Sequence, residues 1–257
     1  MKMHPYAVLA LALLPAFCSL YSAQSTAAAS ILIWPIDPVI EAADQASALW
    51  LENKDSKPVY MQIRVLGWQQ QNGEDNYHSQ SEIIASPPVA TIDPGKRQLI
   101  RLVKTLPVPA GQERAYRILV DEIPRADENK TTQNIDMGLK FQMRYSVPLF
   151  VTGEGVWTRQ NYEHPRDMAT ASLPQLSFRT VNQQGQRGVT IANQGKVHAR
   201  LSKVSWVNGA QHTTLNDGLL GYVLPGAQMT FPAPQGGGTQ LQATVNDQPK
   251  PMVINAR

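Results

Sequence analysis

The sequence predicts an all-β protein with two β-sandwich domains, and three observations support this. Strand-length segments with alternating or continuous apolar residues recur from Ile31 almost to the last residue. Turn-forming residues separate these segments, and the 19 prolines and 17 glycines supply many such breaks. At roughly 100 to 150 residues per domain, a chain of 257 residues favours two domains over one.

The N-terminal residues have the composition of a signal peptide. A lysine precedes the apolar run 7–17, which is too short for the ~20 residues that span a bilayer. Small residues follow, and cleavage after Ala23 or after Ala28 would fit, so we assign residues 1–29 to this segment. The only cysteine, Cys18, lies inside it. We therefore expect the mature chain to fold in an oxidising compartment without a disulfide, stabilised by packing alone.

Residues 30–152 are expected to form the first domain. Strands separated by turns every ~8 to 15 residues are typical of an immunoglobulin-like sandwich. The expected strands include residues 47–53, 59–68, 98–104 and 115–123. The turns between them are expected at residues 53–58, 71–75, 86–88 and 93–95, where Gly, Pro, Asn and Asp are concentrated.

Residues 153–174 show no sustained period and are expected to connect the domains. A second, smaller β-sandwich is expected over residues 175–257. Its expected strands are residues 175–181, 187–193, 199–207, 221–224, 228–232, 239–245 and 251–255. Its hairpin-like turns are expected at residues 182–185, 193–195, 208–209 and 216–218. No internal repeat is visible.

Motifs for catalysis, cofactor binding or metal binding are not recognisable. The five histidines show no metal-binding spacing and have no cysteine companion, so we expect them on the surface or in turns, with no metal site. Neither a G-x-S-x-G motif nor a Walker-type loop is present. The signal carries one of the 23 basic residues and no acid, which leaves 22 basic against 20 acidic residues. We expect no enzyme activity, cofactor, nucleic acid or small-molecule substrate.

Five tryptophans are scattered along the chain. A carbohydrate-binding platform would need several of them on one exposed face. Trp50 and Trp68 fall on strand patterns, so we expect them in the core.

Residues 137–150 form an unusually long alternating segment. About 14 residues is well above the usual five or six of a strand. Its own domain can use part of the apolar face as core, but it cannot easily cover the whole length. An exposed apolar edge strand would promote aggregation unless it is masked or paired with another chain. Pairing by an added strand is a recognised binding mode. The large apolar residues on this face are Met137, Leu139, Phe141, Met143 and Tyr145.

With these features the sequence resembles the periplasmic pilus-assembly chaperones of the chaperone-usher pathway, the PapD-like proteins, and among them the archaic branch. Residues 86–102 contain P-P-V followed by P-G and R-L, and residues 114–124 end in E-I-P. Residues 141–150 resemble the donor strand of the family. The resemblance covers nearly all of the first domain and is weaker in the second.

The resemblance implies two immunoglobulin-like domains set at an angle, with a cleft between them. It also implies a periplasmic chaperone that lends a strand to a pilin subunit lacking one, until the next subunit replaces it at the outer-membrane usher. We then expect a one-to-one complex with the subunit and no cofactor. The donor side chains would be Met137, Leu139, Phe141, Met143 and Tyr145.

Two positions depart from the pattern of the family. Many relatives hold the C-terminal carboxylate of the subunit with an Arg in the first strand and a Lys in the donor strand, but Asp37 and Ser146 occupy those places here. Arg144 and Arg117 are the candidate anchors, and the alternative is that they pair with nearby acids or solvent. Pro58 aligns with a proline that contributes to usher contact in relatives, although a turn-ending proline needs no functional role.

A second interpretation is a secreted two-domain structural or adhesive surface protein of a fimbrial system, whose long strand is only core. A pilin or adhesin of this pathway would normally carry a disulfide. The mature chain has no cysteine, which favours the chaperone.

Overall fold

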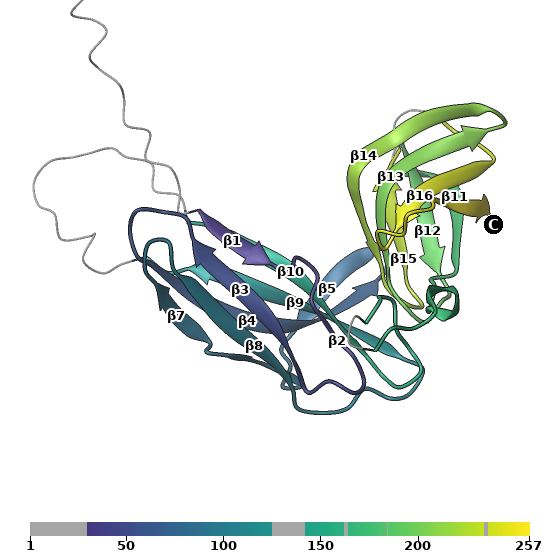
Figure 1. The fold of residues 1–257 in the computed structure, drawn as a ribbon. Helices are drawn as coiled ribbons and strands as arrows, with labels where there is room; N and C mark the ends of the chain where they lie inside the picture. The colour runs from purple at the N-terminus through teal and green to yellow at the C-terminus, as the bar shows by residue number, and fades with distance from the viewer. Residues whose placement is uncertain (1–29, 125–141, 162–163, 184, 234–235) are drawn as a thin grey trace, which may run out of the picture.

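The structure is a computed structural model, and it describes residues 30–124, 142–161, 164–183, 185–233 and 236–257. These residues form two β-rich bodies set at an angle (Figure 1). Apart from one short 3-10 helix, Met168–Thr170, the regular elements described are strands. In these ranges no helix has the length and apolar character needed to cross a membrane. The predicted all-β fold with two domains is confirmed.

The first domain is a sandwich of two sheets. The first sheet has the order β1 (Ile31–Trp34), β3 (Ala46–Asn53), β8 (Arg97–Lys104), β6 (Ile83–Ser86). The second has the order β2 (Val39–Ile40), β10 (Arg144–Thr152), β9 (Glu113–Glu122), β4 (Val59–Gln71), β5 (Glu74–His78), with β7 (Val89–Ile92) also pairing with β4. Alternate apolar residues of both sheets fill the space between them, and Leu49, Ile100, Ile118 and Leu149 are fully buried there.

The first strand changes sheets part of the way along. β1 pairs antiparallel with β3, whereas β2 pairs parallel with β10 through Val39 and Phe150. Pro35 and Pro38 lie between the two parts. Because proline has no N–H for a ladder, strand pairing is interrupted here. The chain therefore runs along the open side of the sandwich and borders both sheets.

The sequence predicted the main strands of this domain to within a few residues, but it missed β5. β4 and β5 form a hairpin whose turn residues Asn72 and Gly73 both have positive φ, 56° and 81°, as an Asn-Gly turn requires. Every residue of β5 is exposed, so it has no apolar alternation that would mark a strand. The tip of the hairpin reaches the second domain, where Gly73 pairs with Met229.

The second domain is built from seven strands that fold around one core. Their order is β14 (Gln211–Val223), β13 (Ala199–Asn208), β16 (Gln240–Val245), β17 (Met252–Ala256), β11 (Leu176–Gln183), β12 (Gln186–Asn193), β15 (Gln228–Pro232). Phe178, Trp206 and Phe231 contribute the largest core side chains. The turn predicted at residues 216–218 is wrong. These residues lie within β14. The register between β13 and β14 shifts at three points, and at each of them β14 carries one extra residue.

The segment between the domains packs against the first domain. Arg166 donates to both carboxylate oxygens of Glu41, at 2.8 and 2.6 Å, and its guanidinium lies 4.3 Å from the ring centroid of Trp157. Arg159 pairs with Asp37, just before β2. These contacts fix where the chain enters the second domain.

Each domain contains a buried corner built around an asparagine in the same way, although the sequence shows no repeat. Asn53 ends β3 and Asn193 ends β12, and both are almost completely buried. Each donates its two amide hydrogens to backbone carbonyls and accepts a hydrogen bond from the N–H two residues further on. At distances of 2.7 to 3.0 Å, the partners are Lys57, Ile92 and Asp55 in the first domain and Val197, Val223 and Gly195 in the second.

Candidate protein-binding edge and cleft

β10 has a partner along its full length on one side only. β9 pairs with it from Arg144 to Thr152, whereas β2 covers only Phe150 and Val151 on the other side. Among the described residues, no strand pairs with the outer side of residues 144–149. This stretch is therefore a free sheet edge.

Two backbone hydrogen bonds show which residues face the edge. The N–H of Glu122 donates to the carbonyl of Met143 at 3.0 Å, so Met143 faces β9. The N–H of Phe150 donates to the carbonyl of Pro38 at 3.2 Å, so Phe150 faces outward. Because backbone groups alternate along a strand, the even-numbered residues of β10 point their N–H and C=O groups to the edge.

The residues at the even positions suit an edge. Pro148 lies at one of them, where its missing N–H removes no hydrogen bond with β9. Arg144 and Ser146 offer both an N–H and a C=O to a further strand. A partner strand can therefore pair with β10 without disturbing the sheet.

The odd-numbered side chains of β10 point into the sandwich. Val147 and Leu149 are buried in the core, and Tyr145 is half-buried against it. The Tyr145 hydroxyl accepts a hydrogen bond from the Ile31 N–H at 3.3 Å, which links β10 to β1 across the open side. Met143, just before the strand, is 37% exposed. The apolar face therefore becomes more exposed towards residue 143.

Only part of the predicted donor strand can be compared with the structure. The strand expected over residues 137–150 is observed from Arg144 onward. Tyr145 lies on β10 and Met143 directly precedes it, on the predicted face. The other three residues, Met137, Leu139 and Phe141, lie outside the described residues, so their role stays a prediction.

Arg144 makes an ion pair on the outer face of the second sheet. Its Nε donates to Asp121, which also accepts from Nη2 of Arg64 at 2.7 Å. Burial acts to raise the pKa of Asp121, but the hydrogen bonds from the two arginines outweigh it and leave this pKa below its usual range. Pairing with a nearby acid, the alternative considered for Arg144, is the arrangement found.

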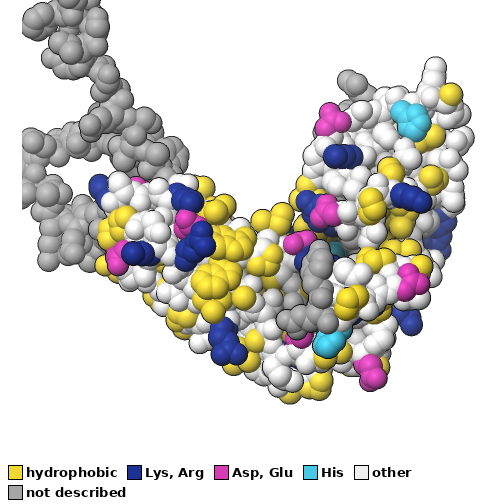
Figure 2. All heavy atoms as spheres, viewed as in Figure 1, with side chains coloured by type: hydrophobic (Ala, Val, Ile, Leu, Met, Phe, Trp, Pro, Cys, Tyr) yellow, Lys and Arg dark blue, Asp and Glu magenta, His cyan; other side chains and the backbone are white. Residues whose placement is uncertain are grey.

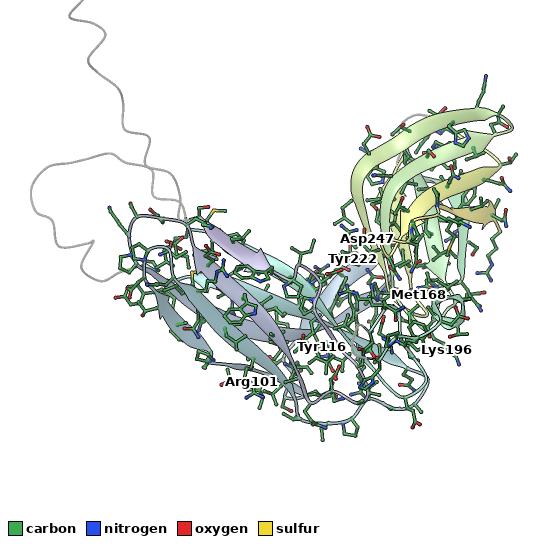
Figure 3. All side chains as sticks on the ribbon, viewed as in Figure 1. Arg101, Tyr116, Met168, Lys196, Tyr222 and Asp247 are labelled. Carbon is green, nitrogen blue, oxygen red and sulfur yellow. The ribbon has the colours of Figure 1, made fainter. Side chains whose placement is uncertain are left out.

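Arg117 lies on β9 at the base of the cleft. Its guanidinium stacks 3.8 Å from the ring centroid of Trp68 and lies 5.3 Å from that of Tyr222, a residue of the second domain. Its Nε is buried without a hydrogen-bond partner among the described residues. Figure 3 shows Tyr222 and Asp247 on the side of the second domain that faces the first. Arg117 is thus a cation held by aromatic rings where the domains meet.

The contact between the domains has an apolar centre and a buried hydrogen-bonded pair of polar side chains. Trp68, Phe150 and Leu224 form a small cluster. His198 stacks on Phe150, with ring centroids 3.4 Å apart, and its Nδ1 lies 3.0 Å from each carboxylate oxygen of Glu113. The expected surface or turn location is therefore wrong for His198. Its partners are distant in the sequence, so no local pattern reveals them.

The two tryptophans expected in the core differ in the structure. Trp68 is buried, but in the contact between the domains rather than in a domain core. Trp50 is half-buried on the outer face of the first sheet, because the residues next to it, Leu49 and Leu51, take the inward positions.

Pro58 directly precedes β4, next to the buried Asn53 corner. Three exposed apolar side chains lie near it, Tyr60, Val89 and Ile123. The Ile123 N–H donates to the carbonyl of Tyr60, and β7 brings Val89 beside β4. Pro58 therefore lies at the border of an apolar surface.

Titratable side chains do not gather into a metal site in the part of the chain that the structure describes. No group of three or more His, Cys, Asp or Glu residues there is placed to hold an ion.

Comparisons with known proteins agree with this architecture. A family model described as the pili and flagellar-assembly chaperone, PapD N-terminal domain, matches residues 38–156. A chain of the CsuC-CsuE chaperone-tip adhesion subunit complex, from the archaic chaperone-usher Csu pili of Acinetobacter baumannii, is 36% identical, with a TM-score of 0.70. The match covers 88% of this chain and 98% of that one.

More distant structures share the fold. A chain of the Salmonella enterica SafA pilin-SafB chaperone complex is 17% identical with a TM-score of 0.60, and the match covers 90% of this chain and 98% of that one. The E. coli chaperone DraB is 20% identical with a TM-score of 0.58, covering 90% and 97%. No match was found among curated protein sequences. From the extent and identity of the first structural match, the chain belongs to the PapD-like pilus-assembly chaperones of the chaperone-usher pathway, in the archaic branch.

Proposed function

We propose that this protein is a periplasmic, non-enzymatic chaperone that captures incomplete pilin subunits by donor-strand complementation and delivers them to an outer-membrane usher. The free edge of β10 is the observation that carries the proposal. Structures of relatives include a chaperone with a tip adhesion subunit and a chaperone with a pilin. A structural or adhesive surface protein would leave this open edge without a purpose.

The energy of capture would come from the donor side chains and from the strand backbone. Each large apolar side chain that becomes buried contributes ~1.5 to 3 kcal/mol. Four of them, Met137, Leu139, Phe141 and Met143, supply much of a tight complex, from which the free energy of ordering both chains must be subtracted. Two methionines among the four suit a surface that meets several subunits, because their side chains adapt to irregular pockets.

Arg117 is the better candidate of the two proposed carboxylate anchors. Arg144 is already paired with Asp121 and its side chain is 64% exposed, so an ion pair there is weak. Arg117 is packed between aromatic rings in the cleft, with its Nε unsatisfied. A carboxylate that binds there gains a charge-assisted hydrogen bond in a place shielded from water.

The usher would bind the surface beside Pro58. Exposed Tyr60, Val89 and Ile123 give this surface an apolar character that solvent alone does not favour. It lies on the same outer face of the second sheet as Arg117 and Trp68, but at the other end of the sheet, where β4 begins. A captured subunit and an usher therefore need not compete for the same residues.

The test is co-expression with the subunit from a neighbouring reading frame, followed by mass measurement of the complex purified from the periplasm. Leu139→Ala combined with Phe141→Ala should abolish co-purification and leave the chaperone folded. Ser146→Pro should reduce the yield of complex at least ten-fold, because it removes an N–H that faces the free edge. Ser146→Ala keeps that N–H and is the matched control, with an unchanged yield. Normal yields from both the double variant and Ser146→Pro would refute donor-strand complementation.

A further inference from the structure

The outer face of the first sheet carries an apolar patch next to the free edge. Its members, which we call the β1 patch, are Leu32, Trp34, Trp50 and Leu99 on the sheet, together with Ile36 in the link that follows β1. Leu32 is 48% exposed and Ile36 is 63% exposed. Figure 2 shows hydrophobic side chains gathered over β1 and β3, on the side of the first domain that borders the hollow between the two bodies. Single exposed apolar residues are ordinary, but a contiguous group rimmed by charge marks an interaction surface.

The patch is held in a fixed arrangement. Trp34 lies opposite Trp50 in the β1–β3 pair, and their rings stack with centroids 6.2 Å apart and planes 11° apart. The guanidinium of Arg97 lies 5.3 Å from the ring centroid of Trp34, and its Nε donates to Glu52 at 3.0 Å. Lys54 pairs with the same carboxylate at 2.6 Å. Rigid tryptophans and an arginine are the residues that contribute most at protein interfaces.

The position of the patch indicates what covers it. Ile31, at the start of β1, is hydrogen-bonded to Tyr145 on β10, and the same chain segment pairs with β10 again at Val39. The segment therefore flanks the free edge of β10 from one end to the other. A folded partner paired with that edge is wider than one strand, so it extends over β1.

We infer that the β1 patch is a second contact surface for the captured subunit, adjoining the donor strand. This inference rests on the proposed function. The part of the subunit that binds here is an apolar surface of its own sandwich with an acidic rim. Two positive charges, Arg97 and Lys54, border the patch and only one carboxylate, Glu52, pairs with them, so the border is positively charged. The patch would hold the subunit in one orientation while its groove receives the donor strand.

The test compares exposed residues at opposite edges of one sheet face. Leu32→Ser with Ile36→Ser changes the patch without touching the core. Ile84→Ser is the matched control, since Ile84 is 53% exposed on the same sheet at its far edge, on β6. Wild-type and variant chaperones with different tags are co-expressed with the subunit from the neighbouring reading frame, and mass spectrometry measures the share of subunit bound to each. The double patch variant should take a tenth of the wild-type share or less, and Ile84→Ser an equal share.

Each outcome separates the two proposals. If the patch variant binds an equal share of the subunit while the Leu139→Ala, Phe141→Ala chaperone binds none, the inference about the patch is overturned and the proposed function stands. If the patch variant and the Leu139→Ala, Phe141→Ala variant each bind an equal share, the inference about the patch and the proposed function are both overturned. Loss of self-association without any change in share assigns the patch to a second copy of the chain and also overturns the inference. Ile36→Ser alone, in the link after β1, repeats the test if the double variant folds poorly.

Discussion

Replacing Asn193 by alanine should destabilise the second domain by about 3 to 4 kcal/mol. The side chain donates to the carbonyls of Val197 and Val223, at 2.8 and 3.0 Å, and accepts from the N–H groups of Gly195 and Gln175, at 2.9 and 3.2 Å. It joins the strand end, the following turn and the end of β14. Alanine leaves all four backbone groups without this partner.

The magnitude follows from the burial of the site. Asn193 is 1% exposed, so water cannot replace the lost bonds without opening the corner. A made hydrogen bond contributes ~1 kcal/mol, and a buried polar group left unpaired costs ~1 to 3 kcal/mol. The four terms are coupled and do not add fully. For a domain of this size, a loss of ~3 kcal/mol lowers Tm by roughly 12 to 24 °C.

The assay must report on each domain, because unfolding of a two-domain chain need not be two-state. Hydrogen exchange followed by mass spectrometry gives the local stability of each domain. Asn193→Ala should weaken protection in β11–β17, and Asn53→Ala should do the same in the first domain. Asn76→Ala on exposed β5 is the control, with a change within ~0.5 kcal/mol. A loss below ~1 kcal/mol for Asn193→Ala would refute the assigned role of the corner.

Two further predictions concern partners. Arg117→Gln should weaken capture of a subunit that ends in its natural carboxylate, but have little effect on a subunit extended by a C-terminal tag. Competition between tagged chaperones measures both effects. Equal weakening for the two subunits would argue against a carboxylate anchor. Pro58→Ala with Tyr60→Ser should leave capture of the subunit intact. It should reduce binding of the chaperone-subunit complex to the purified N-terminal domain of the usher. Unchanged binding would show that this surface does not contact the usher.

The main architecture could be predicted from the sequence because each sandwich strand carries its own apolar alternation. β3, β4, β8 and β9 were located to within a few residues for this reason. β5 has no buried residue and gave no signal. The turn residues 216–218 misled because Asn, Asp and Gly also accommodate bulges within a strand.

The candidate site was predictable only where it is local. The alternating face of β10 is visible in the sequence, and so are the arginines that flank it. The cleft is different, because Glu113, Phe150 and His198 meet only when both domains have folded. The β1 patch was missed for another reason: a tryptophan on a strand fits either face, and only the register with Leu49 and Leu51 places Trp50 outside.

A chaperone that lends a strand must hold that strand in place while one side stays open. The contacts between the domains meet this requirement. Gln70 on β4 donates to the carbonyl of Tyr222 and accepts from the Leu224 N–H, at 3.0 and 2.8 Å. These bonds tie the backbone of the second domain to β4, the strand next to β9 in the second sheet. Together with the buried pair of His198 and Glu113, these bonds resist a change in the angle between the domains. The edge of β10 can then remain unpaired without loosening, because the end of the strand nearest the cleft, at Phe150, is anchored in both domains.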